Sequence, residues 1–503
     1  MNQILQMRGI TKHFPGVLAN DHIDFDVNEG EIHALLGENG SGKTTLMNIL
    51  YGLYQPQEGI IIFDGKEVKI NSPLQSIELK IGMVHQHFML IPVFTVVENV
   101  ILGIEAEKGI KLDLDKAREE IRHLSHEFGL DVDPDAIVWQ LPVGMQQRVE
   151  ILKALYRGAK LLILDEPTAV LTPQEINDLF KILRDMRSHG TSIIFISHKL
   201  NEVMSISDRV TILNRGKVIH TVNTKDTSPS ELARMMVGRE VFLHVDLISQ
   251  ETGDIKLKVE NLKVLNDKKL IAVNDLSLEL RSGEILGIAG VDGNGQSELS
   301  EALGGLRPIE SGKVFVNGVN VTNKRPEIIT QCGMSYVPQD RKKHGVVIDF
   351  SLAENSILRS HKSKEFSANG FSRKTKINEY ADDLIKKFDI RTPNSQVHAK
   401  TLSGGNMQKL ICAREFSRPH EVLIVVQPTR GLDVAAMEFI YSSLVDERSR
   451  GTAILLISTE LDEVFSLSDR IAVIYEGKIV GELARENFNT EQIGLLMAGS
   501  VTH

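Results

Sequence analysis

Residues 37–44 read GENGSGKT and match the phosphate-binding pattern G-x-x-x-x-G-K-[ST] at every fixed position. An apolar run at 31–36 precedes them, and a segment with helical spacing at 43–50 follows. This order predicts a strand, a glycine loop and a helix whose N-terminus and backbone N–H groups surround phosphate oxygens. The residues predicted to bind nucleotide in this loop are Gly37, Glu38, Asn39, Gly40, Ser41, Gly42, Lys43, Thr44 and Thr45.

An acidic pair follows another apolar run, in the stretch LLILDEPT at 161–168. Asp165 and Thr44 are predicted to hold a magnesium ion, and Glu166 is predicted to orient or polarise an attacking water. Lys43 is predicted to reach the β- and γ-phosphates. Phosphoryl transfer needs mainly positioning and charge neutralisation, so these groups suffice for that chemistry.

Three more side chains are candidates because of their places in the chain. Gln86 follows the apolar run 81–84 and is predicted to touch both the metal and the water. His198 follows the run 191–197 and is predicted to reach the γ-phosphate. Phe14, 29 residues before Lys43, is a candidate platform for an adenine ring, and the alternative is an ordinary core aromatic.

The chain contains a duplicated domain. GVDGNGQS at 290–297 aligns with the first glycine loop at an offset of 253 residues, and VPQ at 337–339 aligns with VHQ at the same offset. LSGGNMQK at 402–409 and VLIVVQPT at 422–429 align with LPVGMQQR and LLILDEPT at an offset of 261. Matching blocks in one order predict two domains, at 1–240 and 256–503, joined by a linker at 241–255. The eight additional residues of the second copy are expected in a polar loop at 359–376.

Short β-rich apolar runs alternate with helical patterns in each copy. In the first copy the runs LLIL, SIIFI and VTIL have the composition of strands buried on both faces. Strands separated by helices predict an α/β fold with a parallel sheet.

The composition narrows the classes of function. The formal net charge of -10 argues against a nucleic-acid partner. The two cysteines, Cys332 and Cys412, lack metal-binding spacing, as expected for a reducing compartment. No secretory signal and no run of about 18 apolar residues is present, so we expect a cytoplasmic protein that reaches a membrane only through a partner.

The order of glycine loop, glutamine, LSGG-type segment, DEPT and histidine resembles the ATP-binding cassette ATPases. Two cassettes in one chain without membrane helices resemble the ATPase subunits of bacterial importers for simple sugars and nucleosides, and residues 84–103 are most similar to the nucleoside branch. The resemblance implies that each cassette has a P-loop NTPase core with a parallel sheet, a β subdomain and a helical subdomain. It also implies ATP and Mg²⁺, two integral-membrane permease subunits, an extracytoplasmic substrate-binding lipoprotein, and a peripheral place on the cytoplasmic face of the cell membrane.

The resemblance further implies two composite sites, each completed by the LSGG-type segment of the other cassette. One site then has every expected group, with Ser403, Gly404, Gly405 and Asp433 supplied by the second cassette. The other site keeps a backbone cradle but has Gln296, Val426, Gln427 and Thr459 where a lysine, two acids and a histidine are expected, and it faces Pro142, Val143 and Thr172. The residues predicted for this degenerate site are Gly290, Gly293, Gly295, Gln296, Ser297 and Gln339.

These features favour an ATPase that energises import of a nucleoside, with a simple sugar such as ribose or galactose as the alternative. Hydrolysis is expected at one site only. A soluble translation-associated cassette ATPase is a distant alternative, because such proteins keep both sites and join them by a long charged helix. The apolar run within 87–99 is expected to contact the permeases or to be an ordinary buried segment.

Overall fold

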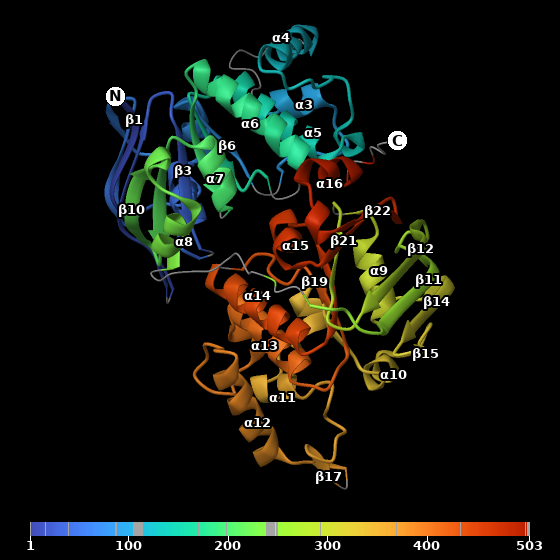
Figure 1. The fold of residues 1–503 in the computed structure, drawn as a ribbon. Coiled ribbons are helices and arrows are strands. Elements are labelled where there is room, and N and C mark those ends of the chain that lie inside the picture. Colours follow the sequence, from blue (N-terminus) through green and yellow to red (C-terminus); the bar gives the residue numbers. More distant parts are fainter. Residues whose placement is uncertain are drawn as a thin grey trace. The chain divides into compact units, whose positions relative to one another are not determined.

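The computed structural model describes two compact units, Met1–Val241 and Phe242–His503, which are treated separately (Figure 1). Within them the described residues are 2–15, 17–38, 40–85, 88–103, 114–168, 171–197, 199–237, 247, 250–291, 293–368, 370–432, 434–497 and 499.

The first unit contains two sheets. The antiparallel sheet has the order β2-β1-β4-β5, and the core sheet has the order β10-β9-β3-β8-β7-β6, in which only β10 runs antiparallel to its neighbour. The strands are β1 (Gln3–Phe14), β2 (Val17–Asn28), β3 (Ile32–Gly37), β4 (Glu58–Phe63), β5 (Lys66–Val68), β6 (Ile81–Val84), β7 (Leu161–Asp165), β8 (Ser192–Ser197), β9 (Arg209–Asn214) and β10 (Lys217–Asn223). The helices are α1 (Lys43–Leu50), α2 (Pro73–Glu78), α3 (Val96–Ile101), α4 (Leu114–Glu127), α5 (Val143–Tyr156), α6 (Pro173–Ser188), α7 (Leu200–Ile206) and α8 (Pro229–Val237).

The core strands of the first unit explain its sequence pattern. Every residue of β3, β7 and β8 is buried, because helices cover both faces of the parallel sheet. The strands β1 and β2 instead alternate between buried and more exposed side chains over much of their length, as expected for a sheet with one solvated face. The predicted α/β architecture, with a parallel core, a β subdomain and a helical subdomain around α3–α5, is confirmed.

The second unit repeats this topology. Its core sheet has the order β16-β19-β20-β13-β21-β22, and its antiparallel sheet has the order β12-β11-β14-β15. The strands are β11 (Ile255–Leu265), β12 (Ile271–Arg281), β13 (Ile285–Ala289), β14 (Ile309–Val316), β15 (Val319–Asn320), β16 (Met334–Val337), β17 (Ser367–Ala368), β18 (Phe371–Ser372), β19 (Val422–Val426), β20 (Ala453–Ser458), β21 (Arg470–Tyr475) and β22 (Lys478–Ala484). The helices are α9 (Gln296–Leu303), α10 (Pro326–Gln331), α11 (Leu352–Ser356), α12 (Lys374–Lys387), α13 (Gly404–Phe416), α14 (Val434–Ser449), α15 (Leu461–Leu467) and α16 (Thr490–Met497).

One sequence-based expectation about an irregular segment needs correction. The stretch 359–376 is not simply a loop, because it contains the hairpin β17–β18, the start of α12 and the buried ring of Phe366. The predicted linker 241–255 stays a prediction, because residues 241–246, 248 and 249 lie outside the described residues. Within it, Gln250 donates hydrogen bonds to the carbonyls of Gly283 and Arg448.

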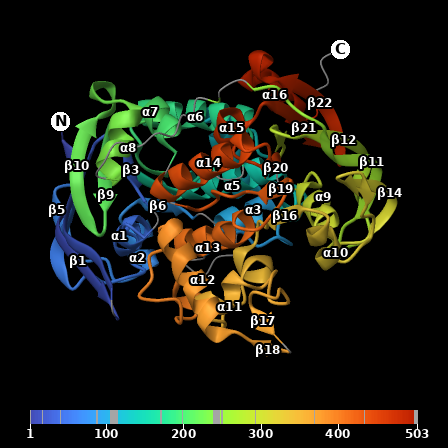
Figure 2. The same ribbon diagram turned by 60° about the horizontal axis from the view of Figure 1, so that its bottom comes forward.

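Figure 2 shows α11, α12 and α13 packed together in the helical part of the second unit. Among the described residues of either unit, no helix combines the length and the apolar character that crossing a membrane requires.

Candidate functional site

The first glycine loop leaves β3 and enters α1 through a glycine that cannot be replaced without strain. Gly42 has φ of 102°, in the left-handed region, and a Cβ there would overlap the carbonyl oxygen of Ala19. The Asn20 side chain, buried beside it, donates to the carbonyl of Gly42 at 3.1 Å. Contacts with the neighbouring strand β2 therefore fix the position of the loop at the N-terminus of α1.

Lys43 places its ammonium inside this loop. The side chain is buried, and Nζ donates to the carbonyl oxygens of Gly37 at 2.6 Å and Glu38 at 2.9 Å. Burial lowers the pKa of Lys43, whereas the carboxylates of Glu166 and Asp165 oppose that shift. A cation held by neutral carbonyls in a dry loop is well placed to interact with phosphate oxygens.

Two of the predicted metal ligands, Asp165 and Thr44, meet at the end of β7. Burial, followed by the neighbouring charge of Glu166, raises the pKa of Asp165 to about 6. Lys43 and a hydrogen bond with the Thr44 side chain oppose this rise. The structure therefore brings Asp165 and Thr44 together as a pair of oxygen donors near the Lys43 charge. Carboxylate and hydroxyl oxygens are suitable ligands for Mg²⁺.

Glu166 turns sharply out of the core sheet. Its φ is 48°, and its backbone N–H donates to the carbonyl of Ile196 on β8 at 3.0 Å. A non-glycine residue in the left-handed region costs of the order of 1–3 kcal/mol. The surrounding sheet imposes that conformation and directs the chain away from the strand end.

Four candidate residues lie outside the described residues, namely Asn39, Gln86, His198 and Asp433. Their predicted roles stay predictions. Of the described residues that precede two of them in the sequence, Ser197 ends β8 and Val84 ends β6.

Phe14 is not an ordinary core aromatic. It ends β1 with 36% of its surface exposed, and its ring meets that of Tyr54 edge to face at 5.4 Å between centroids. The Lys12 ammonium lies 5.3 Å from the Phe14 centroid. Sequence reasoning missed Tyr54, because it belongs to the turn after α1 and only the β1–β4 pairing brings the two rings together.

The second glycine loop keeps the shape of the first without its lysine. Gly295 has φ of 97°, and a Cβ there would overlap the carbonyl oxygen of Ala272. The buried Gln296 begins α9, and its Nε2 donates to the carbonyl of Gly290 at 3.2 Å. Ser297 donates through Oγ to Gln339 Oε1 at 3.1 Å, so the predicted members of this site are brought together.

The strand end of the second unit carries no carboxylate. Val426 is buried, and Gln427 adopts φ of 44° while its N–H donates to the carbonyl of Ile457 at 2.7 Å. The Gln427 side-chain oxygen accepts a hydrogen bond from Arg430 at 2.9 Å. Gln427 keeps the backbone conformation of Glu166, but the second unit has no carboxylate at these two positions to hold a metal or polarise a water.

The two LSGG-type segments differ at their first helical turn. Ser403 caps α13, and its Oγ accepts hydrogen bonds from the backbone N–H and the side-chain amide of Asn406, the latter at 2.9 Å. Gly404, the first residue of α13, is exposed. In the first unit Pro142 occupies the N-cap position of α5 and makes no capping hydrogen bond. Asn406 therefore supports the cap, and this departure from the usual segment leaves the helix N-terminus available to an anion.

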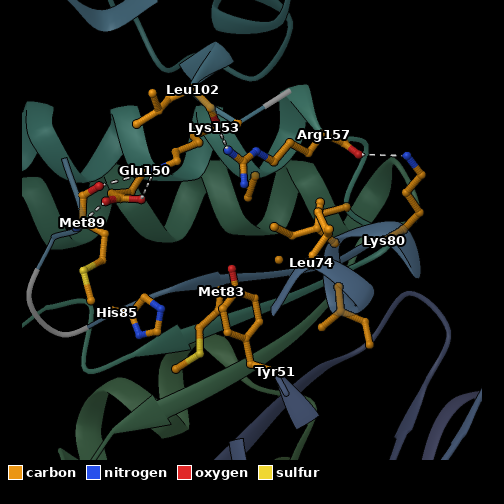
Figure 3. Close-up of a pocket in the computed structure, with 16 residues that line it drawn as sticks. Tyr51, Leu74, Lys80, Met83, His85, Met89, Leu102, Glu150, Lys153 and Arg157 are labelled. Carbon is orange, nitrogen blue, oxygen red and sulfur yellow. Dashed lines mark hydrogen bonds and ion pairs between the residues drawn. The ribbon is translucent and has the colours of Figure 1, made fainter. Parts of the chain in front are cut away.

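A groove of about 390 Å³ lies beside β6 in the first unit (Figure 3). Tyr51, Met83 and His85 line one side, and the α5 side chains Glu150 and Lys153 line the other. Glu150 accepts a hydrogen bond from the backbone N–H of Met89 at 2.6 Å. Burial raises the pKa of Glu150 and lowers that of His85.

The apolar run that follows Gln86 reaches this groove. Met89 and Val93 are 63% and 74% exposed, so the run is not an ordinary buried segment.

Comparison with known proteins reveals relatives over almost the whole chain. The family model described as ABC transporter matches residues 20–169 and 273–430. The guanosine import ATP-binding protein NupO of Bacillus subtilis is 50% identical, and the alignment covers 99% of this chain and 98% of that protein. The nucleoside import ATP-binding protein NupA of Lactococcus lactis is 48% identical over 99% of this chain and 98% of its own length. The glucose import ATP-binding protein TsgD13 of Haloferax volcanii is 45% identical, with coverages of 98% and 96%.

Proposed function

Because this chain belongs to the ABC transporter family, we propose that it is the ATP-hydrolysing subunit of a nucleoside importer. The observation that carries the proposal is the difference between two otherwise matching sites. Lys43, Asp165 and Glu166 occupy the first, whereas Gln296, Val426 and Gln427 occupy the same places in the second. Such a chain hydrolyses ATP at one site and holds nucleotide without cleavage at the other.

The nucleoside specificity is supported by the order of the relatives. Two nucleoside importers are 50% and 48% identical to this chain, whereas a glucose importer is 45% and a ribose importer 40% identical. The simple sugar remains the second candidate, because these identities are close. The ATPase does not contact the transported molecule, so its own sites do not select between the two.

At the hydrolytic site each residue has a distinct role. Lys43 leaves the carbonyls of Gly37 and Glu38 and neutralises the β- and γ-phosphates, while Glu166 orients the attacking water. His198 and Gln86 contact the γ-phosphate and the water. Magnesium, when bound, supplies further charge neutralisation, and the Thr44 hydroxyl and Asp165 carboxylate hold it, together with Gln86.

The second cassette completes this site in the proposed scheme. Ser403, Gly404 and Gly405 offer a hydroxyl, backbone N–H groups and the N-terminus of α13 to the γ-phosphate, and Asp433 follows in the chain. ATP draws the two cassettes together, and hydrolysis lets them separate. Closure of domains around a ligand converts binding into movement of an attached partner.

The groove beside β6 is the proposed docking place for a cytoplasmic segment of a permease. It combines the exposed apolar surface of Met89 and Leu74 with the buried Glu150 and the half-buried Lys153, which pair at 3.9 Å. An amphipathic helix with one apolar face and one polar anchor fits such a groove. This contact holds the subunit at the cytoplasmic face of the membrane, and an extracytoplasmic binding protein delivers the substrate to the permeases.

The test is uptake by proteoliposomes that contain this chain, its two permease subunits and its substrate-binding lipoprotein. With ATP inside, we expect accumulation of radiolabelled guanosine, and we expect Glu166→Gln to abolish it. Accumulation of ribose or galactose instead of nucleosides would favour the sugar alternative. ATP turnover that no membrane partner and no binding protein influences would contradict a transport role.

A second arm tests the groove. Met89→Glu should uncouple uptake from ATP turnover and weaken co-purification with the permeases, because it places a charge on the apolar rim. Leu53→Glu changes an exposed leucine outside the groove residues and serves as the matched control.

A further inference from the structure

Arg341 connects three segments of the second unit. Its Nε donates to Oε1 of Gln408 on α13 at 2.9 Å, and a terminal nitrogen donates to the carbonyl oxygen of Arg430. The other terminal nitrogen lies 3.1 Å from the position that a Cβ would take on Gly404. The planar guanidinium has five donors in a fixed arrangement, so one side chain can hold these segments in register.

The acceptors around Arg341 are neutral oxygens. The nearby Asp340 carboxylate accepts hydrogen bonds from the backbone N–H groups of Lys342 and Lys343, both at 2.9 Å. Burial lowers the pKa of the Arg341 guanidinium, which nevertheless stays charged at neutral pH. Removing this side chain would leave the buried Gln408 oxygen and the Arg430 carbonyl without this donor.

The three segments belong to different parts of the nucleotide machinery. Arg341 comes two residues after Gln339, whose side chain accepts a hydrogen bond from Ser297 at the second glycine loop. Gly404 lies in the segment proposed to serve hydrolysis at Lys43, and Arg430 comes three residues before Asp433 in the sequence. Arg341 thus links the degenerate site to groups that act in the other site.

A cavity of about 650 Å³ adjoins this link. Ser297, Gln339, Arg341, Gly404 and Arg430 all contribute to its lining. A ligand that engages Ser297 or Gln339 therefore lies in the same cavity as the Arg341 side chain, which follows Gln339 by only two residues.

Among the described residues of the first unit, no side chain makes an equivalent link. At the offset of 253 residues, Phe88 stands at the place of Arg341, and at the offset of 261 residues Gln147 matches Gln408. Phenylalanine offers no donor to an α5 glutamine. The chain after Gln86 is instead tied to α5 through the Met89 N–H and Glu150.

We propose that Arg341 is a positioning residue that makes hydrolysis at the first site depend on the state of the degenerate site. It does so by fixing the N-terminus of α13, and with it Ser403 and Gly404, to the segment that follows Gln339. This inference rests on the proposed function, because it requires the LSGG-type segment of the second unit to act on nucleotide bound at Lys43.

The test compares Arg341→Ala with the unchanged chain in detergent-purified complexes with the permeases. We expect kcat for ATP to fall about tenfold to hundredfold, with KM for ATP and the number of bound nucleotides changed less than about twofold. Arg341→Lys should recover part of the loss, and added guanidinium at about 20 mM should stimulate Arg341→Ala but not the unchanged chain. Arg450→Ala, which removes an exposed arginine that follows α14 and pairs with Glu447, is the matched control.

A double substitution separates positioning from general damage. Gln408→Ala should lower kcat less than Arg341→Ala does, and the two together should cost little more than Arg341→Ala alone. Unchanged kcat in Arg341→Ala would overturn the proposal, and so would equal losses of binding and turnover without guanidinium rescue. Failure of the proposed function is seen separately, as normal turnover in Glu166→Gln.

Discussion

The side-chain amide of Gln296 donates to the carbonyl oxygen of Gly290 at 3.2 Å, across the second glycine loop. The ammonium of Lys43 makes the matching contact with Gly37 at 2.6 Å in the first loop. The neutral amide of Gln296 thus keeps the hydrogen bond across the loop, but the loop no longer holds the positive charge that Lys43 supplies in the first unit.

Restoring that charge alone is not expected to restore catalysis. In Gln296→Lys the total rate of ATP hydrolysis should stay within about twofold of the parent, because Val426 and Gln427 still offer no carboxylate for metal or water. Phosphate release under saturating ATP measures this rate. A doubling or more would contradict the assignment of a single hydrolytic site.

Loss of either charged group at the first site should abolish turnover. For Lys43→Ala and Glu166→Gln we expect a fall in kcat of at least about 10²–10³-fold, the effect of removing one preorganised charge-stabilising group. Glu120→Gln, an exposed substitution on α4, should leave kcat unchanged. Near-normal phosphate release by either site variant would refute the roles given to Lys43 and Glu166.

A bulky cation should be far more harmful in one LSGG-type segment than in the other. Ser403→Arg fills the capped N-terminus of α13 and should lower kcat about 10²-fold or more. Pro142→Arg alters a helix start that has no side-chain cap and serves the degenerate site, so its effect should stay within about threefold. Equal losses, measured side by side, would argue against the proposed pairing of segments with sites.

The buried Glu463 predicts a specific pH dependence of stability. It accepts a hydrogen bond from Thr429 at 2.7 Å, and burial raises its pKa to about 7. The folded state keeps a proton that the unfolded chain releases near pH 4.5. The stabilisation of the folded state by this proton is therefore lost as pH rises through 7. The loss between pH 6 and pH 8 should be absent in Glu463→Gln, whose amide cannot ionise.

Thermal unfolding at pH 6, 7 and 8 provides the measurement for Glu463. The melting temperature of the parent should fall relative to that of Glu463→Gln as pH rises. A constant difference across this range would mean that the carboxyl group does not titrate there.

Two neighbouring glycines of the second loop should respond differently to a methyl group. Gly293 and Gly295 have φ of 95° and 97°, but a Cβ on Gly293 meets nothing within 4 Å, whereas one on Gly295 overlaps the Ala272 carbonyl. Both alanine variants pay about 1 kcal/mol or more for the left-handed backbone, and only Gly295→Ala adds a steric clash. Its melting temperature should therefore be several degrees below that of Gly293→Ala, and identical values would refute the crowding.

The sequence allowed the α/β core and the composition of the candidate site to be predicted because both depend on local patterns. The glycine loop, the buried strand before Asp165 and the duplication are visible in short stretches and in their spacing. The pairing of Phe14 with Tyr54 and the contacts of Arg341 were not predictable in this way. They join residues about 40 to 90 positions apart, and no periodicity in the sequence specifies which distant side chains meet.

The stretch 359–376 shows another limit. Its polar composition indicated a loop, but the single ring of Phe366 packs with Ile377 and Tyr380 and orders the segment. One buried aromatic side chain outweighs a run of polar neighbours, because tertiary packing dominates local propensity.

The left-handed backbone at Glu166 recurs at Gln427 with φ of 48° and 44°. In an enzyme with a single copy of this domain, the strained backbone at this position would suggest a role in catalysis. Here the duplicate supplies an internal control: the strain persists where the catalytic carboxylate has been lost. The turn is therefore part of the inherited architecture, and the chemistry of the first copy exploits a geometry that the fold would adopt without it.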